Sequence, residues 1–116
     1  MEPTDLMIKD WVMVKVLSQI PNTYVLHTWA ANDYSRNLQV KPIPLTTEIL
    51  EKNGWKHNGI FMVTIVNENT YFHWTDKYGA TLFQNKYYMC DCNYVHTLQH
   101  ALRLCGLNEL ANNFKI

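Results

Sequence analysis

Residues 60–89 decide the fold class, and they read IFMVTIVNENTYFHWTDKYGATLFQNKYYM. β-Branched and aromatic residues, which suit a pleated and half-buried surface, fill most of this stretch. Two groups of turn-forming residues interrupt it, at Asn67–Asn69 and at Asp76–Gly79. We therefore expect an antiparallel meander of three strands. The expected strands run over 60–66, 71–74 and 81–89.

Three further extended segments precede the meander. WVMVKVL at 11–17 and YVLHTW at 24–29 are rich in β-branched and aromatic residues, so each indicates a strand. The third segment, 38–43, is limited to a sheet edge or a strand end, because Pro42 lacks the N–H that an inner strand would donate. Polar residues over 31–36 predict a loop.

Residues 47–53 are expected to form a short helix, because the sequence carries signals for both of its ends. Thr46 is a good N-cap residue. Gly54 can adopt the positive φ that ends a helix in a Schellman motif, and Trp55 would then contact Leu50.

Two helices are expected near the C-terminus. The first runs from Tyr94 to Cys105, with Asn93 as its N-cap and Gly106 after its end. Apolar residues spaced by three and four predict a shorter second helix over 107–114.

This order of elements predicts an α+β fold with mostly antiparallel strands, in a single compact domain over 1–116. The domain would contain a β-rich part at 1–45, a short helix at 46–55, the β meander at 60–89 and helices at 93–114.

The composition limits the expected partners. The chain has 10 Lys and Arg, 10 Asp and Glu, and a formal net charge of zero. Nucleic-acid binders usually need a basic patch, so nucleic acid is not an expected partner. A near-neutral surface favours self-association, and seven Tyr with four Trp suit an interface or a ligand cleft. We therefore expect a homo-oligomer.

Several absences bear on location. No apolar run approaches the roughly 18 residues of a membrane span, so no membrane partner is expected. Residues 1–5 lack the basic and apolar character of a secretory leader. Three cysteines, an odd number, are typical of free thiols in a reducing compartment. The expected location is the cytoplasm.

Three stretches resemble a family of small uncharacterised proteins from Bacteroides-type bacteria, their phages and their mobile elements. Members carry a Pro-Ile-Pro-Leu-Thr helix and end with a Tyr-Val-His-x-Leu-Gln helix. The resemblance implies an accessory origin in a phage or mobile element, in a host bacterial cytoplasm, and it implies no known catalytic residues. The stretches are DLMIKDWV at 5–12, VKPIPLTTEILEKNGW at 40–55 and YVHTLQHALRLCGLNELANNF at 94–114.

Cysteine and histidine near residue 95 could serve a metal or a nucleophile. Cys90, Cys92, His96 and His100 supply thiolate and imidazole groups, which zinc prefers. The C-x-C spacing is tighter than that of usual zinc sites, so we expect no metal and no cofactor. A thiol with His96 could also form a nucleophile and base. The sequence shows no orienting Asn or Asp at a recognisable spacing, however, and no recognisable oxyanion loop. No phosphate-loop, G-x-S-x-G or H-E-x-x-H motif is present either. Enzymatic activity therefore stays open, with the balance toward none.

The polar side of the C-terminal helix is the main candidate binding surface. A helix face of this kind is either simply solvated or a recognition surface, in which Arg103 offers a planar fork for phosphate or carboxylate. Nearby tyrosines could stack on a nucleotide-like ligand. We expect Arg103→Ala to weaken binding and to leave the fold intact. The candidate ligand-binding residues are His96, Gln99, His100, Arg103, Tyr87, Tyr88 and Tyr94.

Two other histidines, His27 and His73, each lie within an aromatic strand segment. Each is expected to be partly buried, with a backbone hydrogen-bond partner and a structural role.

These observations lead to one functional hypothesis and two alternatives. The hypothesis is a non-enzymatic binding protein of phage or mobile-element origin. It would act on a host protein or sequester a small nucleotide-type ligand, and so counter antiphage defence. The alternatives are a small β-barrel nucleic-acid-binding module and a small nucleotide hydrolase.

Overall fold

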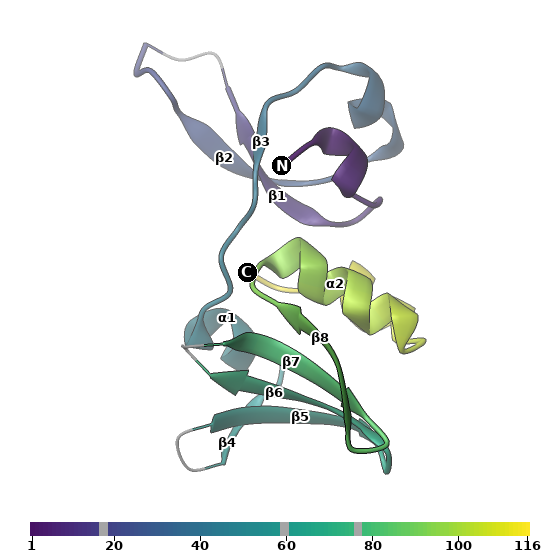
Figure 1. Cartoon of the computed structure of the whole chain (residues 1–116). Helices are drawn as coiled ribbons and strands as arrows, with labels where there is room; N and C mark the ends of the chain where they lie inside the picture. The colour runs from purple at the N-terminus through teal and green to yellow at the C-terminus, as the bar shows by residue number, and fades with distance from the viewer. Residues whose placement is uncertain (17–18, 59–60, 76–77) are drawn as a thin grey trace.

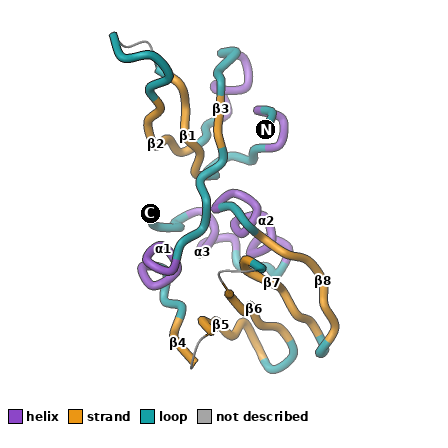
Figure 2. The backbone as a smooth tube through the Cα atoms, turned by 60° about the vertical axis from the view of Figure 1, so that its left-hand side comes forward, coloured by secondary structure: helices purple, strands orange, loops and turns teal. Residues whose placement is uncertain are grey.

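The computed structural model describes residues 1–16, 19–58, 61–75 and 78–116. Within these ranges, strands form two antiparallel sheets of three and five strands, and the α-helices lie between the sheets (Figure 1, Figure 2). The molecule is elongated, with principal extents of 48 × 26 × 20 Å. The expected α+β fold with mostly antiparallel strands is confirmed.

The smaller sheet contains the N-terminal strands. β1 (Trp11–Lys15) lies at its centre, between β2 (Tyr24–Thr28) and β3 (Val40–Lys41). All three expected strands are present, and β3 lies at an edge, as its neighbouring prolines require. The predicted end of the first strand at Leu17 falls outside the described residues. One face of the sheet is covered by a small apolar cluster of Leu6, Val12, Val14 and Trp29.

Two short 3-10 helices flank this sheet, η1 (Pro3–Asp5) and η2 (Ala31–Ser35). The expectation of a loop over 31–36 is therefore wrong for most of that segment. The Asp33 carboxylate accepts the N–H of Ala30 at 2.8 Å, and this hydrogen bond closes the first turn of η2. The polar composition of the segment indicates only an irregular loop.

The larger sheet follows the chain order β4-β5-β6-β7-β8. The hairpin turn at 68–69 is confirmed. Two parts of the prediction lie outside the described residues, namely residues 76–77 of the second expected turn and Ile60 at the start of the meander. β4 was not expected from the sequence. The strands are β4 (Lys56–Asn58), β5 (Phe61–Asn67), β6 (Thr70–Thr75), β7 (Gly79–Gln84) and β8 (Tyr87–Cys92).

The single strand expected over 81–89 is wrong, because a hairpin turn divides it. Asn85 and Lys86 have φ values of 52° and 69°, the positive values that a two-residue type I′ turn requires. Asparagine adopts this conformation readily, but lysine carries no such signal. The chain therefore reverses after Gln84, and β8 pairs antiparallel with β7.

Helix α1 (Thr47–Lys52) begins as expected and ends one residue before the expected Asn53, which is its C-cap. The Thr46 hydroxyl accepts the N–H of Ile49 at 3.2 Å. Gly54 has a φ of 86°. The N–H of Trp55 donates to the carbonyl of Leu50 at 3.1 Å, which is the closing bond of a Schellman motif.

Helices α2 (Val95–Leu104) and α3 (Asn108–Asn112) occupy the expected positions. The N-cap of α2 is Tyr94 rather than the expected Asn93. Gly106 follows α2 with a φ of 80°, as predicted.

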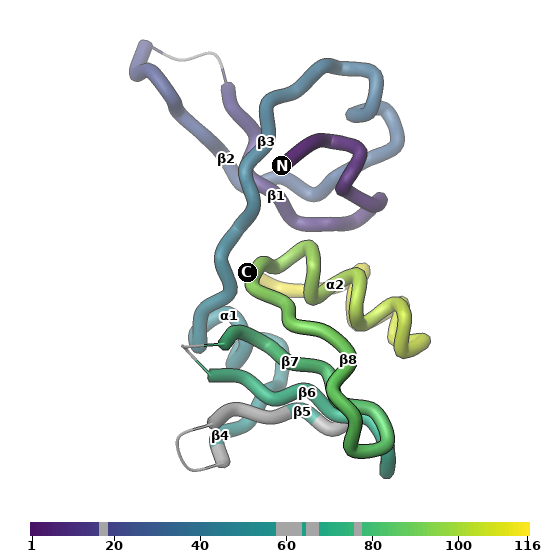
Figure 3. Tube along the Cα trace, viewed as in Figure 1, coloured from purple at the N-terminus to yellow at the C-terminus, as the bar shows by residue number. Residues whose placement is uncertain are grey.

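The larger apolar core lies between the helices and one face of the five-stranded sheet. Alternate residues of the sheet point into it, and the intervening residues point to the opposite face. A single extended segment leads from β3 into α1 and joins the two sheets (Figure 3). The core residues include Leu50, Phe72, Trp74, Leu82, Val95, Leu98 and Leu102.

The C-terminal tail, residues 113–116, is bound at two places. Trp11 Nε1 donates to the carbonyl of Phe114 at 2.6 Å. The Asn53 side chain donates to the Lys115 carbonyl at 2.8 Å and accepts the Lys115 N–H at 2.9 Å. The tail therefore contacts both β1 and the end of α1.

Candidate functional site

Gln99 does not face solvent, although it lies on the polar side of α2. Its side chain is fully buried. Oε1 accepts the N–H of Trp11 at 2.9 Å, and Nε2 donates to the carbonyls of Lys9 at 3.0 Å and Ala111 at 2.8 Å. Gln99 thus satisfies backbone groups of the segment that leads into β1, and its role is structural.

His100 and Arg103 both bind the buried carboxylate of Asp10. His100 Nε2 lies 2.5 Å from Oδ2, which also accepts the N–H of Met7 at 2.8 Å, and Arg103 Nη1 donates to Oδ1 at 2.6 Å. Burial alone would raise the pKa of Asp10. The hydrogen bonds from His100, Met7 and Arg103 outweigh burial and hold that pKa below its ordinary value.

Of the two alternatives for this helix face, simple solvation is therefore wrong for much of it. The segment before β1 covers it, and that segment lies about ninety positions away in the sequence. Arg103 is bound to its own chain through Asp10 and through the carbonyl of Ile8 at 3.2 Å. Because both contacts hold the fold together, the expectation that Arg103→Ala leaves the fold intact is also at odds with the structure.

A second carboxylate, Asp33, has the same arrangement of partners. Its Oδ2 accepts from His27 Nε2 at 2.7 Å and from the Ala30 N–H, and its Oδ1 accepts from Arg36 Nη1 at 3.1 Å. Burial acts to raise the pKa of Asp33, but these hydrogen bonds lower it overall. His27 is partly buried, as expected, but this hydrogen bond is to a carboxylate rather than to the backbone.

A pocket of about 540 Å³ lies at the start of α2, and we call it the helix pocket. The ring of Tyr94 stacks on that of His96, with centroids 6.1 Å apart and planes 16° apart. His96 is buried, and its Nδ1 has no hydrogen-bond partner among the residues that the structure describes. Burial lowers the pKa of His96, so its ring is neutral near pH 7. The lining residues are Met1, Asp5, Pro42, Tyr94, His96, Thr97 and His100.

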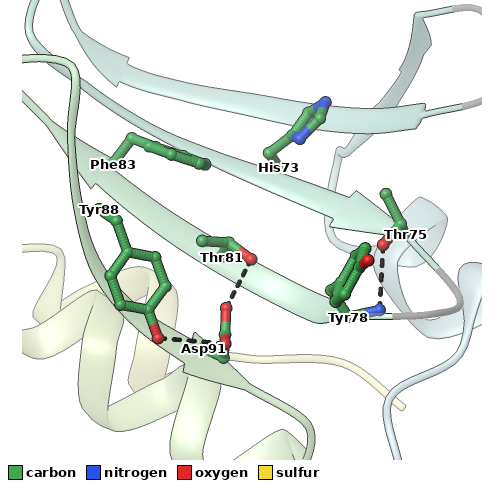
Figure 4. Close-up of a pocket in the computed structure, with 7 residues that line it drawn as sticks. All are labelled: His73, Thr75, Tyr78, Thr81, Phe83, Tyr88 and Asp91. Atoms are coloured by element: carbon green, nitrogen blue, oxygen red, sulfur yellow. Dashed lines mark hydrogen bonds between the residues drawn. The ribbon is translucent and has the colours of Figure 1, made fainter.

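A second pocket, of about 380 Å³, lies on the face of the five-stranded sheet opposite the core, and we call it the sheet pocket (Figure 4). Phe72 and Trp74 point into the core, so the alternation along β6 turns His73 and Thr75 to this side. The lining residues are His73, Thr75, Tyr78, Thr81, Phe83, Tyr88 and Asp91.

One carboxylate organises the polar end of the sheet pocket. Asp91 Oδ1 accepts from the Thr81 hydroxyl at 2.7 Å, and Oδ2 accepts from the Tyr88 hydroxyl at 3.1 Å (Figure 4). The hydrogen bond to Asp91 raises the pKa of Tyr88, so the phenol stays protonated. Asp91 is the only Asp, Glu, Lys or Arg among the described lining residues.

The structure divides the seven residues expected to form one site. Tyr94, His96 and His100 line the helix pocket, and Tyr88 lines the sheet pocket. Gln99 and Arg103 belong to the buried network. Tyr87 is 75% exposed in the β7–β8 hairpin and lines neither of these two pockets.

The sequence interpretation missed most of the sheet pocket. None of the sequence motifs includes Phe83, Thr81 or Asp91, and the sequence predicts only a structural role for His73. Alternation along β6 and β7 was the available signal, since the core-facing residues fix which side chains lie on the other face. The missed turn at Asn85 and Lys86 concealed that β8 brings Asp91 next to Thr81.

Two of the cysteines, Cys92 and Cys105, have raised pKa values in this arrangement. Burial, with the neighbouring Cys90 thiol, raises the pKa of Cys92 to about 12, so this thiol is not ionised at neutral pH. Burial also raises the pKa of Cys105. In the described ranges, no three His, Cys, Asp or Glu side chains are grouped so that they could hold a metal ion.

Comparisons of the chain with protein-family models, with curated proteins and with solved structures gave no match. Within the described residues, none of the helices has the length and apolar character needed to cross a membrane.

Proposed function

We propose that the protein is a non-enzymatic binding protein that engages a host protein through the sheet pocket. The observation that carries this proposal is the aromatic, partly exposed lining of a sheet face that no described helix covers. Tyr78 and Tyr88 are both exposed on it. Tyrosine combines a large apolar area with a hydrogen-bonding group, which is why it is enriched in protein interfaces.

Two observations favour a protein partner over a nucleotide. Arg103, the residue expected to bind a phosphate, is already paired with Asp10. The sheet pocket carries the Asp91 carboxylate and no Lys or Arg among its described lining residues, so a phosphate would meet repulsion there. Origin in a phage or mobile element, and action against host defence, rest on the resemblance alone and are proposed as such.

The same observations bear on the two alternatives. A nucleic-acid-binding module would need basic side chains along an exposed face, and this open sheet face offers a carboxylate. A nucleotide hydrolase with a thiol nucleophile would need a cysteine that ionises readily, and the raised pKa of Cys92 opposes that role for this residue. Neither alternative gains support from a specific contact.

The proposal is tested by photo-crosslinking in host cells. A photoreactive phenylalanine analogue at position 78, an exposed residue of the sheet-pocket lining, should capture one host protein in preference to others. Phe83→Ala with Tyr88→Ala should abolish this capture, because both substitutions remove aromatic lining. Val25→Ala, at a partly exposed apolar residue of β2, is the matched control and should leave capture unchanged.

Circular dichroism melts of the variants separate a lost surface from a lost fold. Capture that is equal in the aromatic double variant and in the control, with all variants folded, would show that the partner does not use this pocket.

A further inference from the structure

The aromatic lining of the sheet pocket is held in a fixed arrangement. Phe83 stacks on Tyr71 across the β6–β7 pair, with ring centroids 5.1 Å apart and planes 14° apart. The ring of His73 meets Phe83 edge to face, at 6.4 Å and 68°. Tyr78 and Tyr88 lie on either side of the Phe83 and His73 rings (Figure 4). Aromatic faces arranged in this way attract a cation that is brought within about 6 Å of a ring.

Asp91 provides two acceptor positions at the edge of this lining. Within the described part of the chain, each of its carboxylate oxygens accepts one hydrogen bond, from Thr81 or from Tyr88. A carboxylate oxygen can accept two hydrogen bonds, so each oxygen retains one acceptor position. A guanidinium group presents two parallel N–H donors that match such a pair, whereas an ammonium group is a point charge without this fork.

The size of the pocket suits one long side chain. A pocket of about 380 Å³ lies at the small end of the range for ligand sites. A planar guanidinium can stack on an aromatic face and donate to a carboxylate at its edge at the same time. The described lining residues provide both groups in one pocket.

We infer that the sheet pocket binds the guanidinium of an arginine side chain presented by the partner protein, between the aromatic lining and Asp91. This inference rests on the proposed function and specifies the chemistry of the partner. A second copy of this chain is a poor source of that arginine. The chain has two arginines, Arg36 and Arg103, and both are already paired with carboxylates.

The test is a titration of the ¹⁵N-labelled protein with N-acetylarginine amide, followed by amide chemical shifts. Shifts at Thr81, Phe83 and Asp91 should saturate with a Kd in the low millimolar range. Asp91→Asn keeps the shape of the side chain and removes its charge, and it should weaken binding about fivefold or more, since charge-assisted hydrogen bonds are the stronger ones. Glu48→Gln is the matched control, because Glu48 also accepts from a threonine hydroxyl, and it should leave the Kd unchanged.

Two further probes test the chemical class. N-acetyllysine amide should bind more weakly than the arginine compound, because it lacks the planar fork. Adenosine monophosphate should not shift the pocket amides. Equal affinity for the lysine and arginine compounds, tighter binding of the nucleotide, or an unchanged Kd in Asp91→Asn would each overturn the inference.

The outcome separates this inference from the proposed function. If crosslinked capture depends on Phe83 and Tyr88 but not on Asp91, the pocket binds a partner without an arginine. If Arg36→Ala lowers the mass of a self-associated species and removes the occupancy of the pocket, the arginine comes from a second copy, and the inference is wrong.

Discussion

Arg103 and Asp10 form an ion pair, 93 positions apart, in which Nη1 lies 2.6 Å from a carboxylate oxygen that has no exposed surface. The pair joins α2 to the segment that leads into β1. Removing one partner of a buried pair leaves an uncompensated charge, which costs more than the pair itself contributes.

Arg103→Ala is therefore expected to lower the free energy of unfolding by about 3 kcal/mol. Urea denaturation at pH 7 measures this difference. Arg36→Ala is the control, because Arg36 holds the corresponding place beside Asp33 but its side chain is 59% exposed, and it should cost less than about 1 kcal/mol. Equal small losses in both variants would mean that the Asp10 network contributes little to stability.

Acid should destabilise the fold through Asp10 and Asp33, whose pKa values are both lowered in the folded state. The unfolded chain then binds protons at a higher pH than the folded protein does. The stability from these carboxylates is complete above about pH 5 and is lost as the pH falls through about 4 and below. The urea concentration at the unfolding midpoint, measured from pH 7 to pH 3, should decrease as the pH falls through this range.

Asp10→Asn should flatten that dependence and lower stability at pH 7. Asp5→Asn, at an exposed carboxylate, should leave the slope nearly unchanged. A slope that is the same in all three proteins would assign the acid sensitivity to other groups.

Among the glycines that the structure describes, Gly79 is the one at which a side chain should be tolerated least. Its φ is 79°, and a Cβ placed there would contact Asn93 Oδ1 and lie 2.8 Å from the Cys92 carbonyl. Gly54 has a similar φ of 86° but open space around it. Gly54→Ala should cost about 1 kcal/mol from the backbone conformation alone, and Gly79→Ala should cost clearly more. Thermal melts that rank the two variants in the opposite order would contradict this reasoning.

Self-association stays a prediction from the zero net charge and the many aromatic residues. An edge strand can pair with a second chain, and β2 is an edge that exposes Val25 and Leu26. Sedimentation at tens of micromolar should show an oligomer, and Leu26→Lys should shift it toward the monomer. Asp91→Asn should leave the oligomer unchanged, because the sheet pocket is assigned to a different partner. A monomer for the unmodified chain would refute the prediction.

The features that could be predicted from the sequence are those that residues close together in the chain determine. Thr46 and Gly54 each act within their own turn of chain, so the ends of α1 could be located to within one residue. Lys86 carries no positive-φ signal of its own, so the β7–β8 turn could not be seen. Gln99 and its backbone partner at Trp11 are 88 positions apart, and no periodicity connects them. For this reason a buried structural network looked like an exposed binding surface.

The binding of the C-terminal tail by Trp11 and Asn53 has a consequence for proteolysis. Proteolytic removal of residues 114–116 would cut no helix and no strand. It would nevertheless remove the acceptor of the Trp11 indole, the two hydrogen bonds between the Asn53 amide and Lys115, and the buried Phe114 ring. The shortened chain would lose contacts at β1 and at α1 in one event. Cleavage within the helices should then be faster than the first cleavage.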